Sequence, residues 1–484
     1  MIIEDTGQFW WEGEEDINSA TGQLTIDENG LTTLRMHAPF GNEAFPDNLM
    51  VRTKQPGKKI RGRLISSGNC VLLDELESSV RSFNSLSFNY YPRHCYVADK
   101  HIDDAVFTGM RLHVQGLNNW FRSGMIECDG DTEDEVTFVL KTEPDYHWNL
   151  DTLNLYLKNH ITYKTSHSPH ISLSAEVQIC FELISDQKIV SEDMLDWMRG
   201  LEEFISLVSG GSYVFPWPEM MWMEDDIDCS ATCYFQRGNL SESNITTTGL
   251  FPFSRISNEF GTLFNIWQSK RKVIGPGLHL YTGTIKNPHM YIEHRFVSLI
   301  WGLEALDRLK PECTPGVAEQ ERAEKALRLI QLICTRSDGE YITGLNYSDR
   351  QWLKKAIKNA AERTLAERIY DMLKPVSMDI NAKLLQTFCE ECATQRNRLS
   401  HTGGGKHAKD YKEFINEIYP RQKALEVMYR LVLLNLIGLD GSFIREIVYD
   451  SPQSFQILFY YYKAELITRE DFARLKGDAA TKFD

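Results

Sequence analysis

The stretch LLQTFCEECATQRNRLSHTGGG, residues 384–405, decides how the second half of the chain folds. Its apolar positions recur at helical spacing and predict an amphipathic helix: Leu385, Phe388 and Cys392. The three glycines at 403–405 cannot continue a helix and predict where it ends. Arg396, Asn397 and His401 are therefore expected in the last turns of a packed helix.

These three polar residues carry chemistry that suits a phosphate. Arginine stays charged and its planar fork matches phosphate oxygens, whereas histidine titrates near neutrality and can exchange a proton. In a regular helix Asn397 and His401 share a face, and Arg396 lies about 140° from His401. The long arginine can reach round if the last turn loosens. Such a set suits RNA cleavage without a metal, in which a 2′-hydroxyl attacks the phosphorus. The alternative is an ordinary polar helix end, where the macrodipole favours arginine and histidine.

The surrounding sequence is helical. Residues 286–440 have helical periodicity and predict an all-α bundle. RFVSLIWGLEALDRL at 295–309 is apolar nearly all round, which predicts a buried central helix. Pro420 is expected to cut the following helical segment in two. Residues 441–484 predict a helical tail packed on the bundle.

The first part of the chain, residues 1–280, has a different period. Segments such as GQLTIDENGLTTLRMHA at 22–38 and DEVTFVLK at 134–141 alternate apolar and polar residues, and turn formers separate them. One helix is expected at 192–211. The pattern predicts a β-rich domain of sandwich or barrel-like form, so the fold class of the whole chain is predicted to be α+β.

The net charge of −16 is unevenly distributed. Residues 286–484 hold 30 Lys and Arg against 28 Asp and Glu, which leaves 22 against 40 in residues 1–285. This asymmetry indicates two domains with different partners, of which only the second tolerates a polyanion. The acidic N-terminus is unlike a signal peptide, the longest apolar run is too short to span a membrane, and the ten cysteines are scattered. We therefore expect a reduced, cytoplasmic protein without a membrane partner.

Two segments of the helical part resemble a known family. RNRLSH at 396–401 is similar to the R-x4-6-H motif of HEPN-domain ribonucleases, and SLIWGLEALDR at 298–308 is similar to a central helix of that domain. Together with the phrases GQFWWEG at 7–13 and GQLTIDENG at 22–30, the whole chain resembles ApeA-like anti-phage defence proteins.

Carried over residue by residue, the resemblance implies that Arg396 and His401 are catalytic and that Asn397 is the polar residue following the arginine. It implies a metal-independent endoribonuclease that arrests growth of an infected cell, as in abortive infection. Transfer RNA is one candidate substrate, and a phage-derived component is a candidate trigger. The β-rich domain is expected to restrain the activity or to sense the trigger.

One motif supplies one histidine, whereas strand cleavage gains from both a base and an acid. A two-fold dimer would bring two sets of Arg396 and His401 to one phosphate. HEPN proteins are known for this arrangement, so we predict a homodimer with a composite site. The alternative function is a non-catalytic adaptor that dimerises or binds RNA, but such adaptors lose the arginine or the histidine.

Other groups have weaker signals. Arg350, Lys354 and Lys358 recur at i, i+4 and i+8 and are predicted to bind an RNA backbone, although such a row is commonly a solvated helix face. Glu304 stands in an otherwise apolar helix. It either orients a catalytic residue or is a satisfied buried carboxylate.

Two cysteine pairs each mimic half of a zinc site, Cys389-x2-Cys392 and Cys229-x3-Cys233. The first is expected within a helix, where the thiols are not ideally placed, and no second pair stands at finger-like spacing. We therefore expect neither a metal nor another cofactor.

Overall fold

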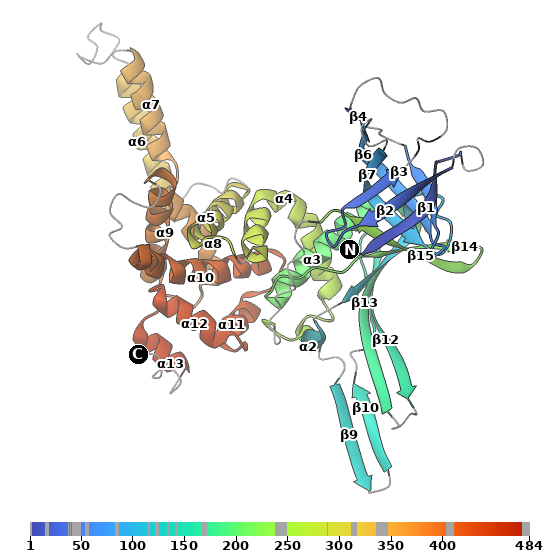
Figure 1. Ribbon diagram of the computed structural model, residues 1–484. Coiled ribbons are helices and arrows are strands. Elements are labelled where there is room, and N and C mark those ends of the chain that lie inside the picture. Colours follow the sequence, from blue (N-terminus) through green and yellow to red (C-terminus); the bar gives the residue numbers. More distant parts are fainter. Residues whose placement is uncertain are drawn as a thin grey trace. The chain divides into compact units, whose positions relative to one another are not determined.

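The computed structural model divides the chain into two compact units, Met1–Gln268 and Ser269–Asp484, which are described separately (Figure 1). The residues that the structure describes are 2–14, 19–36, 38, 40, 50–53, 58–82, 87–114, 117–121, 125–132, 135–141, 144–166, 172–237, 249–287, 289–310, 317–334, 347–402 and 411–476.

Six antiparallel strands of the first unit close into a ring, in the order β7-β3-β2-β1-β5-β6 and back to β7. The strands are β1 (Ile3–Trp11), β2 (Ala20–Ile26), β3 (Thr32–Met36), β5 (Ile60–Leu64), β6 (Cys70–Ser82) and β7 (Ser87–Ala98). Because β7 pairs with both β3 and β6, the ring is a small closed barrel. The prediction of a β-rich, barrel-like domain is confirmed.

The barrel interior is filled by the side chains on one face of each strand. The buried cluster includes Phe9, Leu24, Leu34, Ile60, Leu73 and Tyr90. Phe9 occupies the space beside Gly62, where an added Cβ would lie 2.2 Å from its ring. Glycine at 62 is therefore a packing requirement of the large ring at position 9. Trp11 closes one side of the core, with its ring 5.1 Å from that of Phe40.

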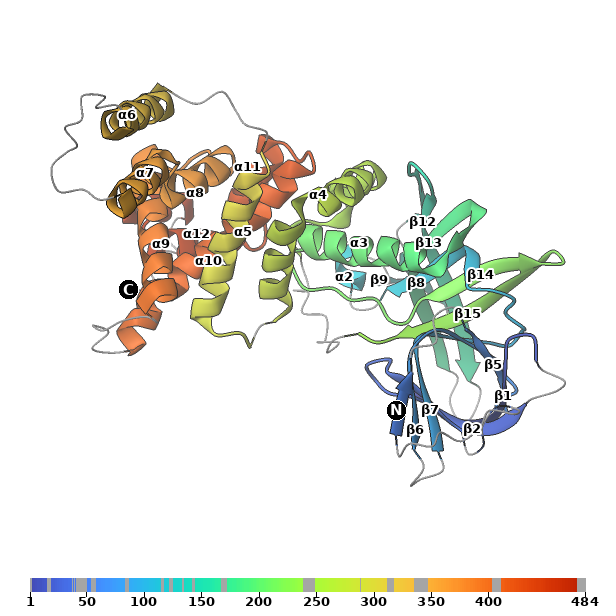
Figure 2. The same cartoon turned by 90° about the horizontal axis from the view of Figure 1, so that it is seen from above.

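Beyond the barrel the sheet continues from β7 through β15, β14, β8, β13 and β12 to β11 (Figure 2). These strands are β8 (Val106–Val114), β11 (Tyr146–Asn149), β12 (Asn154–Ser166), β13 (Ser172–Val190), β14 (Glu219–Glu224) and β15 (Ile227–Phe235). Three further strands lie outside this run, namely β4 (Met50–Thr53), paired with β6, and the separate pair β9 (Met125–Thr132) and β10 (Glu135–Lys141). The short helix α2 (Asn118–Phe121) precedes β9.

An aromatic core joins this part of the sheet to α3 (Ser191–Ser209). The ring of Phe260 lies 5.1 Å from that of Phe204 on α3 and 5.7 Å from that of Phe181 on β13. The indole of Trp148 on β11 donates to the carbonyl of Ser257, 2.8 Å away. Large aromatic rings, with the indole N–H of Trp148 hydrogen-bonded, therefore hold α3 against one face of the sheet.

Charged side chains from several strands meet on the sheet beside this core. Glu182 on β13 is 3 % exposed and accepts from Arg111 Nε at 2.8 Å and from Lys158 Nζ at 2.5 Å. Arg111 also contacts Glu219, which bonds His113 at 3.1 Å. Burial works to raise the pKa of Glu182, but the hydrogen bonds from Lys158 and Arg111 outweigh it, so its pKa is lowered. The bond to His113 lowers the pKa of Glu219.

The second unit is helical, so the prediction of an α+β chain is confirmed. Its described helices are the end of α4 (Phe260–Lys286), then α5 (Ile292–Arg308), α6 (Val317–Cys334), α7 (Tyr347–Ala361), α8 (Leu365–Leu373), α9 (Ala382–Thr402), α10 (Tyr411–Leu436), α11 (Gly441–Tyr449), α12 (Ser454–Lys463) and α13 (Arg469–Lys476). Helix α4 crosses the boundary between the units and is kinked at Gly275. No described helix is both long and apolar enough to cross a bilayer.

Helix α5 is the centre of the bundle and packs against α8, α9 and α10. Gly302 lets α10 approach closely, since an added Cβ would lie 2.4 Å from the hydroxyl of Tyr429. That hydroxyl donates to the carbonyl of Gly277 at 2.8 Å. The expected burial all round is not found, because Trp301 on the outer face of α5 is 43 % exposed.

The expected break at Pro420 is wrong, because α10 runs continuously from Tyr411 to Leu436. A proline inside a helix removes one backbone hydrogen bond and tends to bend the helix. Ile418 and Gln422, on the two sides of Pro420, are both buried, so the parts of α10 before and after the proline both pack on the bundle.

Replacing Glu182 by glutamine should lower the free energy of unfolding by about 2 kcal/mol, because two charge-assisted hydrogen bonds are weakened. The lowered pKa values of Glu182 and Glu219 also set a pH dependence. Their stabilisation is complete above the ordinary value of 4.5 and is lost as the pH falls below it. Urea unfolding between pH 7 and pH 3 tests this, with Asp186→Asn, an exposed residue of the same strand, as the control. Equal stability losses for both variants would contradict the assignment.

Candidate active site

Helix α9 places the predicted motif by burying the face that leads to it. The buried residues are Leu385, Phe388, Cys389, Cys392 and Ala393, and the helix packs on α5 and α8. It continues regularly through Thr402, so the last described turn does not loosen in the way that would let Arg396 reach round to His401. His401 belongs to the last turn of α9, but its side chain and residues 403–410 lie outside the described part.

Arg396 is held by groups from two helices. Its Nη1 donates to Oδ1 of Asn397 at 2.9 Å, and its Nη2 lies 3.4 Å from Oε2 of Glu304 on α5. The guanidinium carbon lies 5.9 Å from the centre of the Trp301 ring. The side chain is 21 % exposed, and its buried Nε has no hydrogen-bond partner among the described residues. Arg396 is therefore oriented, and the second N–H group of each of its Nη atoms remains for a ligand.

Glu304 is shared between two arginines. Its Oε1 accepts from Arg308 at 2.8 Å, one turn along α5, while Oε2 faces Arg396. The hydrogen bond to Glu304 raises the pKa of Arg308. Glu304 is 19 % exposed. Of the two alternatives for this residue, the geometry favours orientation of Arg396.

A second carboxylate of α5 ties the neighbouring helix to the site. Asp307 is 1 % exposed and lies 3.2 Å from Nη1 of Arg363 and 3.5 Å from Nη1 of Arg368. Arg363 also pairs with Asp371 on α8. Because Asp307 stands one turn from Glu304, the ion pairs that fix α8 and α9 converge on one end of α5.

An open groove of about 740 Å³ lies along α8 and α9, and Asn397 is at its wall. Its charged lining residues are Arg322, Arg363, Glu367, Asp371 and Glu390. The arginines are already paired, since Arg322 contacts Glu367 at 2.7 Å and Arg363 contacts Asp371. The groove has the size of a ligand site, but its walls offer shape and polar groups rather than a surplus of positive charge.

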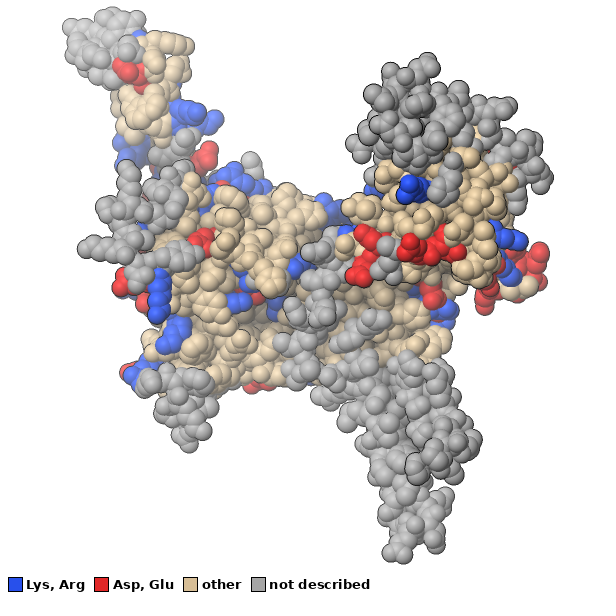
Figure 3. Space-filling model, in the orientation of Figure 1, with Lys and Arg blue, Asp and Glu red and all other residues tan. Residues whose placement is uncertain are grey.

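The basic row predicted to bind RNA lies on another element. Arg350, Lys354 and Lys358 belong to α7, which packs on α6, whereas Arg396 contacts α5. Lys358 is exposed, while Arg350 and Lys354 are half-buried. Figure 3 shows basic side chains spread over the helical unit, and acidic side chains grouped on the β-rich unit.

One group of side chains in the β-rich unit has metal-ligand character. The ligand atoms of His160, Cys180 and Glu182 lie within 4.8 Å of one another. However, both oxygens of Glu182 are engaged by Arg111 and Lys158, and burial raises the pKa of Cys180 to about 12. A cation would have to displace a lysine and remove a thiol proton. These residues fit a polar network better than a metal centre.

The cysteine pairs show the same obstacle. Cys389, Cys392, Cys229 and Cys233 are buried. Burial raises the pKa of Cys389 to about 12 and that of Cys392 well above its usual range. In Cys389 and Cys392 burial thus disfavours the thiolate, which is the form that binds zinc or attacks an electrophile.

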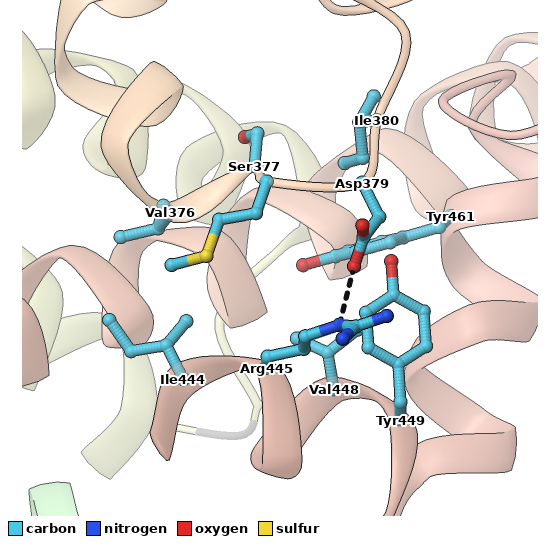
Figure 4. Close-up of a pocket in the computed structure, with 10 residues that line it drawn as sticks. Val376, Ser377, Asp379, Ile380, Ile444, Arg445, Val448, Tyr449 and Tyr461 are labelled. Carbon is cyan, nitrogen blue, oxygen red and sulfur yellow. Dashed lines mark hydrogen bonds and ion pairs between the residues drawn. The ribbon is translucent and has the colours of Figure 1, made fainter. Parts of the chain in front are cut away.

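A small cavity near the start of α9 is not a substrate site (Figure 4). Its volume is about 10 Å³, enough for one water molecule. Arg445 and Asp379 pair at 2.9 Å beside it, and the buried hydroxyl of Tyr461 has no hydrogen-bond partner among the described residues. A single water bonded to Tyr461 fits this space.

Asp307→Asn should lower the free energy of unfolding by about 3 kcal/mol, because Arg363 and Arg368 lose a buried counter-charge. The control is Asp371→Asn, which removes the half-exposed partner of the same Arg363 and should cost less than about 1 kcal/mol. Urea unfolding followed by circular dichroism measures both values. The anchoring role of Asp307 would be refuted by a smaller loss for Asp307→Asn than for Asp371→Asn.

Comparison with protein families assigns both units. The family described as ApeA N-terminal domain 1 matches residues 4–267, and the family described as Apea-like HEPN matches residues 297–442. Neither a curated protein nor a solved structure matched the chain. The second match contains both Glu304 and the Arg396–His401 motif. The chain thus belongs to the ApeA-like HEPN proteins of anti-phage defence.

Proposed function

We propose that this protein is a metal-independent endoribonuclease of the HEPN type, acting in abortive infection. The observation that carries the proposal is the position of Arg396, which Glu304 and Asn397 orient five residues before His401 on α9. HEPN domains are typically ribonucleases, and the family match covers this whole region. The R-x4-H spacing is complete.

In the proposed reaction the 2′-hydroxyl of RNA attacks the adjacent phosphorus, and the 5′-oxygen of the next nucleotide leaves. Arg396 donates from its remaining N–H groups to the phosphate oxygens, whose negative charge grows in the transition state. Glu304 and Asn397 hold the guanidinium in place before the substrate arrives, so less orientation is required during the reaction. His401 transfers a proton to or from the reacting oxygens.

A homodimer would complete this site. One histidine serves either as base for the 2′-hydroxyl or as acid for the leaving oxygen, and a two-fold partner would provide the second. HEPN domains commonly dimerise, which supports this arrangement. A sedimentation experiment that finds a fully active monomer would contradict it.

The wider substrate contacts are proposals of the same kind. Arg350, Lys354 and Lys358 on α7 are proposed to follow the RNA backbone, since α7 presents them in one row. The choice of transfer RNA, the phage-derived trigger and the restraint by residues 1–280 remain predictions from the resemblance and the charge distribution.

Arg396→Ala and His401→Ala should each reduce RNA cleavage at least about 100-fold, because each removes a group that acts in the transition state. The control is Arg398→Ala, an exposed arginine two residues along the same helix, which should cleave like the unchanged protein. Cleavage should persist in EDTA, stop with 2′-deoxy sugars and leave 5′-hydroxyl ends. If both motif variants fold and still cut RNA, the chain is better described as a non-catalytic adaptor.

Glu304→Gln should reduce kcat about 10-fold to 100-fold with a smaller change in KM, because Arg396 loses its orienting charge but keeps its own. Glu413→Gln, an exposed carboxylate in the first turn of α10, is the control. Steady-state kinetics on one RNA oligonucleotide measure the effect. A Glu304→Gln enzyme with normal kcat would show that the ion pair serves only the fold.

A further inference from the structure

Helix α5 presents one large aromatic side chain to solvent beside the proposed site. Trp301 is 43 % exposed, although Leu299, Ile300 and Leu303 on the same helix are completely buried. An exposed tryptophan loses the stabilisation that burial of its large apolar surface would give. Its position next to a charged, oriented site therefore points to a ligand that stacks on it.

Three charged side chains lie beside Trp301. Glu304 lies one turn along α5, Arg308 lies two turns along the same face, and the guanidinium of Arg396 lies 5.9 Å from the ring centre. With these charges on one side of the ring, and Val297 and Ala305 only half-buried on the same helix, Trp301 is not the centre of the large apolar surface typical of a protein interface core. A flat ring with a cation beside it suits a nucleobase joined to a phosphate.

The contacts also define a path across the site. Trp301 is next to Arg396, Arg396 donates to Asn397, and Asn397 belongs to the wall of the groove along α8 and α9. A phosphate bound at Arg396 would thus lie next to both Trp301 and Asn397.

We propose that Trp301 stacks the base next to the phosphate held by Arg396, and that the substrate is therefore a single-stranded segment of RNA. The inference rests on the proposed ribonuclease function. In a duplex the base is already stacked between its neighbours and cannot turn onto the indole, whereas an unpaired base can. Stacking on an aromatic side chain strengthens binding roughly 5-fold to 150-fold per base and is largely independent of sequence.

The test measures binding without cleavage. A single-stranded oligonucleotide with 2′-fluoro sugars lacks the attacking hydroxyl, and fluorescence anisotropy gives its Kd for the full chain. Trp301→Ala should weaken binding about 10-fold or more, and Trp301→Phe should weaken it less because a ring is retained. Tyr291→Ala is the matched control, since Tyr291 is an exposed aromatic residue just before the same helix. It should leave the Kd unchanged, and the strand annealed to its complement should bind equally to all variants.

Cleavage and sedimentation separate the remaining outcomes. Normal single-strand binding and normal kcat/KM in Trp301→Ala, with cleavage lost in Arg396→Ala, would overturn the stacking role and leave the nuclease intact. Single-strand binding that depends on Trp301, without any cleavage by the unchanged protein, would support stacking and overturn the nuclease. A Trp301→Ala variant that changes its oligomeric state would show a protein contact instead, which also overturns the proposal.

2-Aminopurine in the strand adds a direct signal, because its fluorescence should be quenched by the unchanged protein and not by Trp301→Ala.

Discussion

Two carboxylates one turn apart on α5 attract arginines from the two neighbouring segments of the bundle. Glu304 faces Arg396 of α9, and Asp307 faces Arg363 and Arg368 at the start of α8. A nearly inaccessible carboxylate such as Asp307 is stable only when it is paired, so the helices that provide its partners must stay in register with α5. The same requirement places Arg396 beside Trp301 and Asn397. The geometry of the candidate site therefore depends on these ion pairs.

Sequence periodicity was sufficient for the features that depend on neighbouring residues. The apolar spacing before Arg396 predicted an amphipathic α9, and the change of period predicted an α+β chain. The exposed face of α5 could not be predicted, because Trp301 stands in a run that is apolar nearly all round and has no distinct polar side. The helix break predicted at Pro420 was wrong for a related reason, because the effect of a proline inside a helix depends on how α10 packs.

Long-range pairings account for most of what the sequence did not reveal. Arg363 is 56 residues from Asp307 along the chain, and Arg396 is 92 residues from Glu304. Nothing in the local pattern links such positions. The closed ring likewise depends on β7 joining both β3 and β6. The groove along α8 and α9 is a further example. The sequence does not show that its two arginines are paired with Glu367 and Asp371, so from the sequence alone both could be taken as free to bind a phosphate.

Ring closure in the β-rich unit also limits how that unit can recognise a peptide. Every strand of the ring has a hydrogen-bonded neighbour on each side along part of its length, so many of its backbone groups are already engaged. An extended peptide that binds by strand addition needs a free edge. Within the described sheet, β4 and β11 outside the ring have such an edge along their whole length, because each pairs with a single strand. Recognition by the closed part of the barrel therefore depends on its side chains or its connecting loops.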